Sequence, residues 1–274
     1  MIKKILKEFI PPILLKYLKT KPKYGWFGDY PTWDEAKKES IGYDTDTILL
    51  KVKESLLKVK NDDNLYELDT LLYKRYDYPY NWQALTSLLL ISQLNDNRLN
   101  VVDFGGSLGS SYFQHRRMLS HLTELNYQIV EQNHFVEEGK KSFEDNHLSF
   151  HYNLENCIKG IKTNCLLLSG VIQYIEDPYK LIKEILQYEI DYIIIDRTPF
   201  FLNMPDRITI QKVSPDYHEA IIPCRIFNYE RFKNYFLEKY NVITESISID
   251  GRMRVEDVFA EQRFILFRSN KSMN

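Results

Sequence analysis

The stretch VVDFGGSLGSSYF, residues 101–113, decides the fold of this 274-residue chain. An apolar run ends in Asp103, three glycines follow within six residues, and two serines lead into a helix-length segment. Glycines in such a turn let the backbone approach a ligand closely, and the following helix directs its N-terminal N–H groups toward that ligand. The pattern predicts a ligand-binding strand–turn–helix unit, with a purely structural turn as the alternative.

Further apolar runs downstream extend this unit into a sheet. The predicted strands are 99–104, 127–131, 148–152, 165–169, 192–196, 242–249 and 263–268, and the predicted helices between them are 110–123, 134–144, 178–188 and 229–239. Five runs are followed by helices or helix-length crossovers, which indicates a buried parallel sheet. The last two runs lie close in sequence and are expected to pair as an antiparallel hairpin at one edge. We therefore expect an α/β fold with a Rossmann-like, doubly wound sheet of about seven strands, the last one antiparallel.

Residues 1–95 differ from the rest and are interpreted as a basic arm followed by a helical cap. Helices are predicted in this cap at 32–39, 47–60, 65–75 and 82–95, the first of them capped by Thr32. The sheet domain is expected at 96–274, with an insertion at about 200–226 that faces a substrate.

The charge of the chain is unevenly distributed. Residues 1–23 carry seven lysines and one glutamate, so this arm is +6 and the remaining chain carries −8 of the overall −2. A basic, apolar arm can contact an anionic membrane surface or a partner protein, but the interpretation that we favour is a frayed terminus or a helix packed on the core. The near-neutral total argues against a protein that coats nucleic acid.

Other features place the chain in a cellular compartment. No apolar run approaches the ~20 residues of a transmembrane helix. Cys157, Cys165 and Cys224 form no CxxC pair, which predicts reduced thiols, and no metal site is expected. The N-terminus lacks a small-residue cleavage site, which argues against secretion. Together these observations predict a cytoplasmic protein.

A second acid supports the binding of a cofactor with a ribose. Glu131 ends the predicted strand 127–131, and in doubly wound sheets an acid at this position accepts hydrogen bonds from ribose hydroxyls. A solvated charge at a strand end is the alternative. A nicotinamide cofactor would place its pyrophosphate near Asp103, where the two would repel each other, whereas the ammonium group of S-adenosylmethionine would be attracted. Asp103 therefore favours a methyl donor.

Linked in order, the motifs of the chain resemble those of class I S-adenosylmethionine-dependent methyltransferases. More narrowly, they resemble a family of methyltransferases found among genes for capsule and lipopolysaccharide biosynthesis. The motifs that carry the resemblance are YGWFGDYPTWDEA (24–36), GYD (42–44), DFGGSLGSSYFQ (103–114), VEQ (130–132), LSGVIQYIEDPY (168–179), IIIDRTPF (193–200), ITIQKVSP (208–215) and IPCRIF (222–227).

The resemblance implies S-adenosylmethionine as the cofactor and a set of residues that contact it. That set is Asp103, Gly105, Gly106, Ser107, Gly109, Glu131, Gln132, Asn153, Ser169, Gly170 and Gln173. In this assignment Asp103 and the glycines hold the methionine portion, Glu131 binds the ribose, and Gln132 and Asn153 lie beside the adenine.

The implied acceptor is a small molecule, a hydroxyl or phosphate-type oxygen on a sugar- or nucleotide-linked intermediate of capsule or surface polysaccharide biosynthesis. A hydroxyl acceptor needs a general base, for which His218 is the first candidate and Asp196 the second. Arg197 and Asp196 could orient the acceptor or pair with each other. If the acceptor is already anionic, Arg197, Arg207 and Arg225 would serve as anion clamps.

Two other functions stay open at this point. One is an NAD-dependent sugar oxidoreductase, which shares the strand–glycine turn–helix unit. The other is a catalytically silent scaffold that keeps the fold and the cofactor site.

Overall fold

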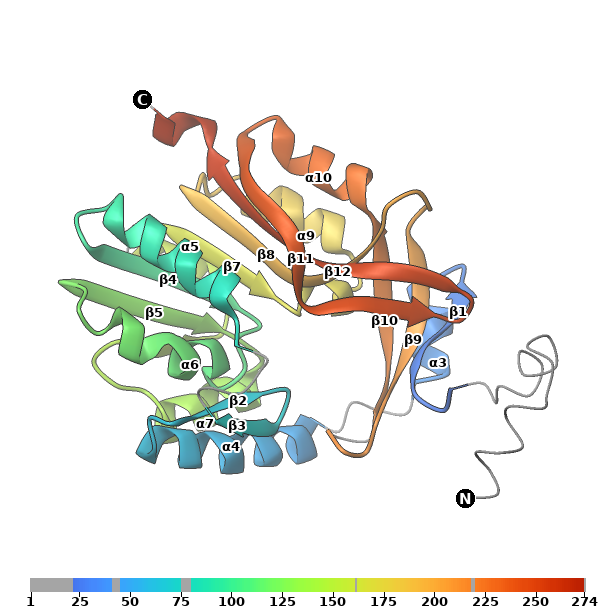
Figure 1. Ribbon diagram of the computed structural model, residues 1–274, viewed down its shortest axis with the longest axis horizontal. Helices are drawn as coiled ribbons and strands as arrows, with labels where there is room; N and C mark the ends of the chain where they lie inside the picture. Colours follow the sequence, from blue (N-terminus) through green and yellow to red (C-terminus); the bar gives the residue numbers. More distant parts are fainter. Residues whose placement is uncertain (1–21, 41–44, 75–79, 161, 218–219, 274) are drawn as a thin grey trace, which may run out of the picture.

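The computed structural model describes residues 22–40, 45–74, 80–160, 162–217 and 220–273, and a large sheet runs through most of them (Figure 1). Its strands are β1 (Gly25–Tyr30), β4 (Arg98–Phe104), β5 (Glu124–Val130), β6 (Leu148–His151), β7 (Cys165–Ser169), β8 (Tyr192–Phe201), β9 (Arg207–Val213), β10 (Ala220–Asn228), β11 (Tyr240–Val255) and β12 (Val258–Ser269). Their order in the sheet is β10-β9-β1-β11-β12-β8-β7-β4-β5-β6.

One half of this sheet has the predicted parallel architecture. Strands β6, β5, β4, β7 and β8 are all parallel to their neighbours, and β12 lies antiparallel beside β8. The crossovers are α6 (Ser110–Leu119), α7 (Asn133–Ser142), α8 (Leu154–Gly160) and α9 (Pro178–Ile185). The chain winds outward from β4 through β5 to β6 and then returns to the other side of β4 with β7. Ligands bind at such reversal points, at the carboxyl ends of the strands.

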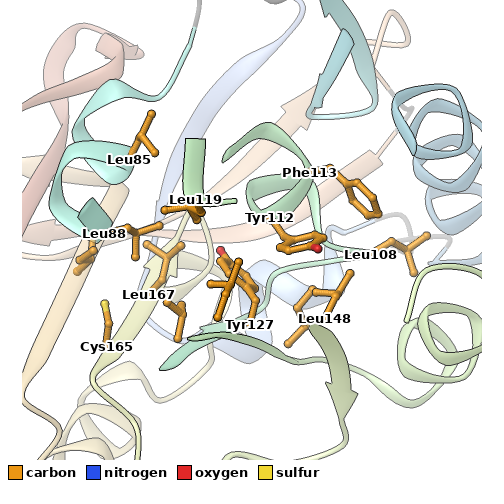
Figure 2. Packing of buried hydrophobic residues seen from close by; sticks show 14 of the residues in the cluster. Leu85, Leu88, Leu108, Tyr112, Phe113, Leu119, Tyr127, Leu148, Cys165 and Leu167 are labelled. Carbon is orange, nitrogen blue, oxygen red and sulfur yellow. The ribbon is translucent and has the colours of Figure 1, made fainter. Parts of the chain in front are cut away.

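Apolar side chains on both faces hold the parallel half together. Val101, Leu167 and Ile194 point into one core cluster, which Figure 2 shows from close by with Leu88, Tyr127 and Cys165. Their sequence neighbours point into a second cluster on the opposite face, with α9 and α10 (Tyr229–Leu237). This burial on both faces explains why the strands read as continuous apolar runs.

The other half of the sheet closes on itself. Strand β10 pairs with β9 along its length and also with the end of β8, while β1 joins β9 to β11. Strands β8, β12, β11, β1, β9 and β10 therefore form a closed ring, called here the strand ring. Figure 1 shows it beside the parallel half, with the long strands β8, β11 and β12 passing through both.

The strand ring corrects the prediction of about seven strands. Strand β1 comes from the region expected to be a helical cap, and β9 and β10 come from the expected insertion at about 200–226. The hairpin of β11 and β12 lies in the middle of the sheet instead of at an edge, because both strands continue into the ring where β11 meets β1. Pairing between segments so far apart in the chain produces no local sequence pattern from which it could be predicted.

The segment at 65–75, predicted to be a helix, is a β-hairpin of β2 (Leu65–Leu68) and β3 (Leu71–Lys74). Its two-residue turn places Asp69 and Thr70 at φ 52° and 72°. Such turns require positive φ at both central residues and usually carry glycine there. Because Asp and Thr stand where glycine is usual, the sequence did not predict this turn.

The remaining helices in the N-terminal region agree with the predictions. Helix α3 (Trp33–Lys38) is capped by Thr32, whose side-chain oxygen accepts a hydrogen bond from the Glu35 amide. Helices α4 (Thr45–Asn61) and α5 (Trp82–Gln93) follow. Among the described helices, none is both long and apolar enough to cross a bilayer. The basic arm lies outside the described residues, apart from its last two positions.

Candidate functional site

The glycine turn after β4 forms the centre of the candidate site. Gly105 adopts φ +74° and donates its N–H to the Val130 carbonyl at 2.9 Å. A Cβ on Gly105 would lie 2.3 Å from Val171 Cγ2, and a Cβ on Gly106 would lie 2.6 Å from Asp103 Cγ. The turn therefore admits no side chain at either position. Gly109, at φ +99°, is the N-cap of α6.

Asp103 lies directly beneath this turn and is 1% exposed. Its Oδ2 accepts a hydrogen bond from the Tyr127 hydroxyl at 2.9 Å. Burial raises the pKa of the Asp103 carboxyl to about 7. A carboxyl in this state gains more from a nearby positive charge than one in water, because the low dielectric strengthens the attraction.

Two more of the predicted cofactor residues follow β5, the neighbouring strand. Burial raises the pKa of Glu131, whose carboxylate accepts a hydrogen bond from the Gln132 N–H at 2.7 Å. Gln132 is the N-cap of α7, and its side chain makes no capping hydrogen bond. Both residues line the same cavity as Asp103 and Ser107. The structure thus brings these predicted cofactor residues together.

Asn153 lies on the edge of the cavity after β6. Its Oδ1 accepts a hydrogen bond from the Asn156 amide at 2.9 Å and thereby caps α8. Part of this side chain therefore has a local structural task.

Ser169 and Gly170 follow β7 and are held by Asp196 of β8. The Ser169 hydroxyl donates to Asp196 Oδ2 at 2.7 Å, and the Gly170 N–H donates to the Asp196 carbonyl at 3.0 Å. Asn81 donates to the same Oδ2 at 2.8 Å. Asp196 is fully buried, and burial raises its pKa. Ser169, Gly170 and Asn81 line the cavity, whereas Asp196 lies behind them.

Arg197 lines the cavity, and its partners differ from the expected one. Its Nε donates to Asp250 at 2.7 Å, and its Nη2 pairs with Asp69 in the turn of the β2–β3 hairpin. The alternative in which Arg197 pairs with Asp196 is therefore wrong. Its guanidinium is already shared by two carboxylates, and these hold its pKa well above the ordinary value against the opposing effect of burial.

The two other predicted arginines do not join Arg197. Arg207 pairs with Asp29 at 3.5 Å, and Arg225 donates to the Glu176 carbonyl at 3.2 Å. Neither of them lines the cavity, so the three do not form a common anion clamp. His218, the first candidate for a general base, lies outside the described residues.

Glu67 belongs to this site although the sequence did not single it out. It lies on β2, is 2% exposed, and accepts hydrogen bonds from the Thr70 amide at 2.6 Å and from the Ser110 hydroxyl. Burial raises its pKa to about 7. The available signal was an acid flanked by apolar residues, and the prediction of a helix at 65–75 gave it no reason to be buried.

These residues line a cavity of about 3010 Å³ between the parallel half and the strand ring. Ligand sites usually measure about 300–1,000 Å³, so this cavity has room for more than one ligand. The acids Asp103 and Glu131, at the ends of β4 and β5, line it together with Glu67 from the β2–β3 hairpin. Its wall on the strand ring carries the aromatic residues Trp26 and Phe27 and charged residues of both signs, namely Lys212, Arg252 and Arg254 together with Asp250, Glu256 and Asp257.

No protein-family model and no curated protein matches this chain. Solved structures with a similar fold include the N-terminal domain of EvdMO1 in the presence of SAH and D-fucose, at 11% identity and a TM-score of 0.45, over 84% of this chain and 100% of that one. Magnesium protoporphyrin IX methyltransferase (ChlM) from Synechocystis PCC 6803 with bound SAM matches at 11% and 0.42, over 68% and 79%. N-methyltransferase NodS from Bradyrhizobium japonicum WM9 with SAH matches at 12% and 0.41, over 80% and 98%.

Proposed function

We propose that the protein is an S-adenosylmethionine-dependent methyltransferase. The observation that carries this proposal is the group of carboxyls Glu67, Asp103 and Glu131, whose pKa values burial raises, around one glycine turn. Arg197, a cation in the same cavity, is already paired with two other acids. Buried carboxyls without a cationic partner favour a positively charged ligand and disfavour a pyrophosphate.

The residues present fit this cofactor. Asp103 and the turn of Gly105, Gly106, Ser107 and Gly109 would hold its methionine portion, since a Cβ on Gly106 would fill the space beside the carboxyl. Glu131 would bind the ribose, with Gln132 and Asn153 toward the adenine. When bound, S-adenosylmethionine supplies an electrophilic methyl group on a sulfonium.

The chain's own contribution is to place the two reactants in line. Methyl transfer gains much of its rate from positioning, so rigid walls beside the reacting atoms matter. Asp196 fixes the turn of Ser169 and Gly170 and the N-cap of α5 through Asn81. We assign Asp196 this positioning task and keep His218 as the proposed base for a hydroxyl acceptor.

The proposed acceptor is a small sugar- or nucleotide-linked intermediate of capsule or surface polysaccharide biosynthesis, methylated on oxygen in the cytoplasm. The resemblance of the sequence motifs supports the pathway. Trp26, Phe27 and Lys212 in the wall of the strand ring support the chemical class, because aromatic rings stack on sugars or bases and a cation attracts phosphates.

Calorimetric titration with S-adenosylmethionine, S-adenosylhomocysteine and NAD tests the proposal. We expect S-adenosylmethionine to bind and NAD not to bind. Asp103→Asn, which removes the charge and keeps the shape, should weaken S-adenosylmethionine binding about 100-fold, or roughly 2.7 kcal/mol. Asp34→Asn, an exposed acid on α3, is the matched control and should bind like the unmodified protein.

The other outcomes point to different functions. Binding of NAD without a response to S-adenosylmethionine would indicate an oxidoreductase. Binding of S-adenosylmethionine without any formation of S-adenosylhomocysteine across sugar and nucleotide-sugar acceptors would indicate a silent scaffold.

A further inference from the structure

Two buried glutamine amides in the cavity have unused hydrogen-bonding capacity. Gln173 lies in the 3-10 turn η1 (Ile172–Tyr174) after β7 and is 3% exposed, and Gln262 lies on β12 and is 8% exposed. The Oε1 atom of each is buried and accepts no hydrogen bond from the described residues. Leaving a buried polar atom without a partner is costly, and such atoms usually belong to a binding site or meet water.

Both amides lie over the same stretch of β8. Gln173 Nε2 donates to the Arg197 carbonyl at 3.3 Å, and Gln262 is the cross-strand partner of Pro199. Both side chains line the cavity, one from the parallel half and the other from the strand ring. Both glutamines therefore lie beside residues 197–199 of β8, the strand that the parallel half and the strand ring share.

The order of the strands separates this place from the other proposed cofactor residues, so Gln173, which the resemblance placed among the cofactor contacts, is assigned here to the acceptor instead. The proposed cofactor contacts follow β5 at Glu131, β4 at the glycine turn and β7 at Gly170, which are successive neighbours in the sheet. The next strands along the same edge are β8 and β12, which carry Arg197 and Gln262. A methyl donor that extends from β5 to β7 would thus direct its methyl end toward the two amides.

The charge at this place argues for a neutral ligand group. The guanidinium of Arg197 is paired with Asp69 and Asp250, so a phosphate here would compete with two carboxylates. The unused capacity is that of amides, whose oxygen and nitrogen exchange places on rotation and can serve a hydroxyl group as acceptor or donor.

We propose that Gln173 and Gln262 form an acceptor subsite that binds hydroxyl groups of a sugar ring. The assignment rests on the proposed methyl-donor site, and it adds that the reacting end of the acceptor is a neutral polyol. Any phosphate of the acceptor is then left to another cation of the cavity, such as Lys212.

Saturation-transfer NMR with methyl α-D-glucopyranoside, on the full chain saturated with S-adenosylhomocysteine, tests this subsite. We expect saturation transfer to the sugar, and we expect Gln173→Leu and Gln262→Leu each to weaken the Kd for the sugar at least tenfold. The Kd for S-adenosylhomocysteine, measured by calorimetry, should stay within twofold and thereby show that both variants fold. Gln187→Leu, at an exposed glutamine after α9, is the matched control and should change neither Kd.

Three results would overturn the subsite. They are absence of saturation transfer with the unmodified protein, unchanged sugar binding in both leucine variants, and displacement of the sugar by an equal concentration of inorganic phosphate. Failure of the methyl-donor proposal looks different. In that case S-adenosylhomocysteine does not bind, whereas the sugar still binds and still depends on both glutamines.

Discussion

The two walls of the cavity are built in opposite ways. The wall on the parallel half comes mainly from consecutive strand–turn–helix units, in which a strand delivers Asp103 or Glu131 directly to the edge of the sheet. The wall on the strand ring comes from β1, β9, β10, β11 and β12, strands from distant parts of the chain that close into a ring where β10 returns to the end of β8. The first wall carries buried acids around a glycine turn, and the second carries aromatic rings, the Gln262 amide and charged groups of both signs.

This difference suggests a division of labour within the proposed function. A donor common to many reactions can be held by a short, rigid motif whose contacts are largely backbone. An acceptor of particular chemistry needs side chains of several kinds, and strands from distant segments can supply them without altering that motif. Changes in the first wall should therefore affect the donor, and changes in the second should affect the acceptor or the joining of the two halves.

The largest effect is expected at Gly105, where alanine would break the donor wall itself. Its Cβ would lie 2.3 Å from Val171, at a φ that L-residues rarely adopt. We expect Gly105→Ala to lower the free energy of unfolding by about 3 kcal/mol and to abolish S-adenosylmethionine binding, as measured by urea denaturation and calorimetry.

Gly251→Ala is the matched control for this change. Gly251 has a similar φ of +71°, and its Cβ would meet nothing within 4 Å. This variant should cost only about 1 kcal/mol and leave donor binding intact. Equal losses in both variants would show that backbone strain, and not the close packing of the turn, is what Gly105 provides.

The next effect is a dependence of donor affinity on pH. Burial raises the pKa values of Asp103 and Glu67 to about 7, so both carboxyls gain charge as the pH rises through 7. A cationic ligand binds the ionised forms better, and a single such carboxyl makes the affinity about tenfold higher at pH 8 than at pH 6. Calorimetry should show this rise for S-adenosylmethionine and also for S-adenosylhomocysteine, because both carry the ammonium group that Asp103 attracts. A donor affinity that does not change with pH would contradict a role of Asp103 and Glu67 in donor binding.

In the free protein, ionisation of the same carboxyls lowers the free energy of unfolding. The pKa of Glu67 is higher in the folded than in the unfolded state. The contribution of Glu67 to the free energy of unfolding is therefore complete at low pH and is lost as the pH rises toward and through 7. Glu67→Gln removes this loss, so its Tm should exceed that of the unmodified protein at pH 8 and approach it near pH 4. Glu137→Gln, an exposed acid on α7, should show no such difference.

The smallest effect is expected where the two walls join. The Tyr174 hydroxyl, in the turn after β7, donates to Gln211 Oε1 of β9 at 2.6 Å. Tyr174→Phe should lower the free energy of unfolding by about 1 kcal/mol and leave the affinity for S-adenosylmethionine within twofold. The exposed Tyr152 gives the control Tyr152→Phe, with no measurable loss in urea denaturation. A large change in donor affinity would mean that the two walls are energetically coupled.

The donor wall was predictable because its signals are local. A buried strand that ends in Asp103, a cluster of glycines and a helix start lie within thirteen residues, and Glu131 follows at the end of the next strand. The period of the apolar residues also predicted the five parallel strands and the antiparallel β12. These features depend only on residues that are close in the chain, so their pattern can be recognised in the sequence.

Other site residues could not be identified in this way. Glu67 lies in a hairpin whose Asp-Thr turn lacks the usual glycine, and a helix was predicted instead. Gln262 has no distinguishing sequence context, since its significance comes from lying opposite Pro199 on a strand from another part of the chain. The partners of Arg197, Asp69 and Asp250, come from two hairpins far from it in sequence.

The amino-acid sequence alone was sufficient for the glycine turn, the acids at the strand ends and the parallel half, because hydrophobic periodicity and turn chemistry act over a few residues. Only the tertiary structure could close the strand ring, bury Glu67 beside Ser110, neutralise Arg197 and leave the amides of Gln173 and Gln262 without partners. Each of these depends on contacts between distant segments. The near-neutral charge of the whole chain likewise gives no sign of the buried acids that gather around the glycine turn.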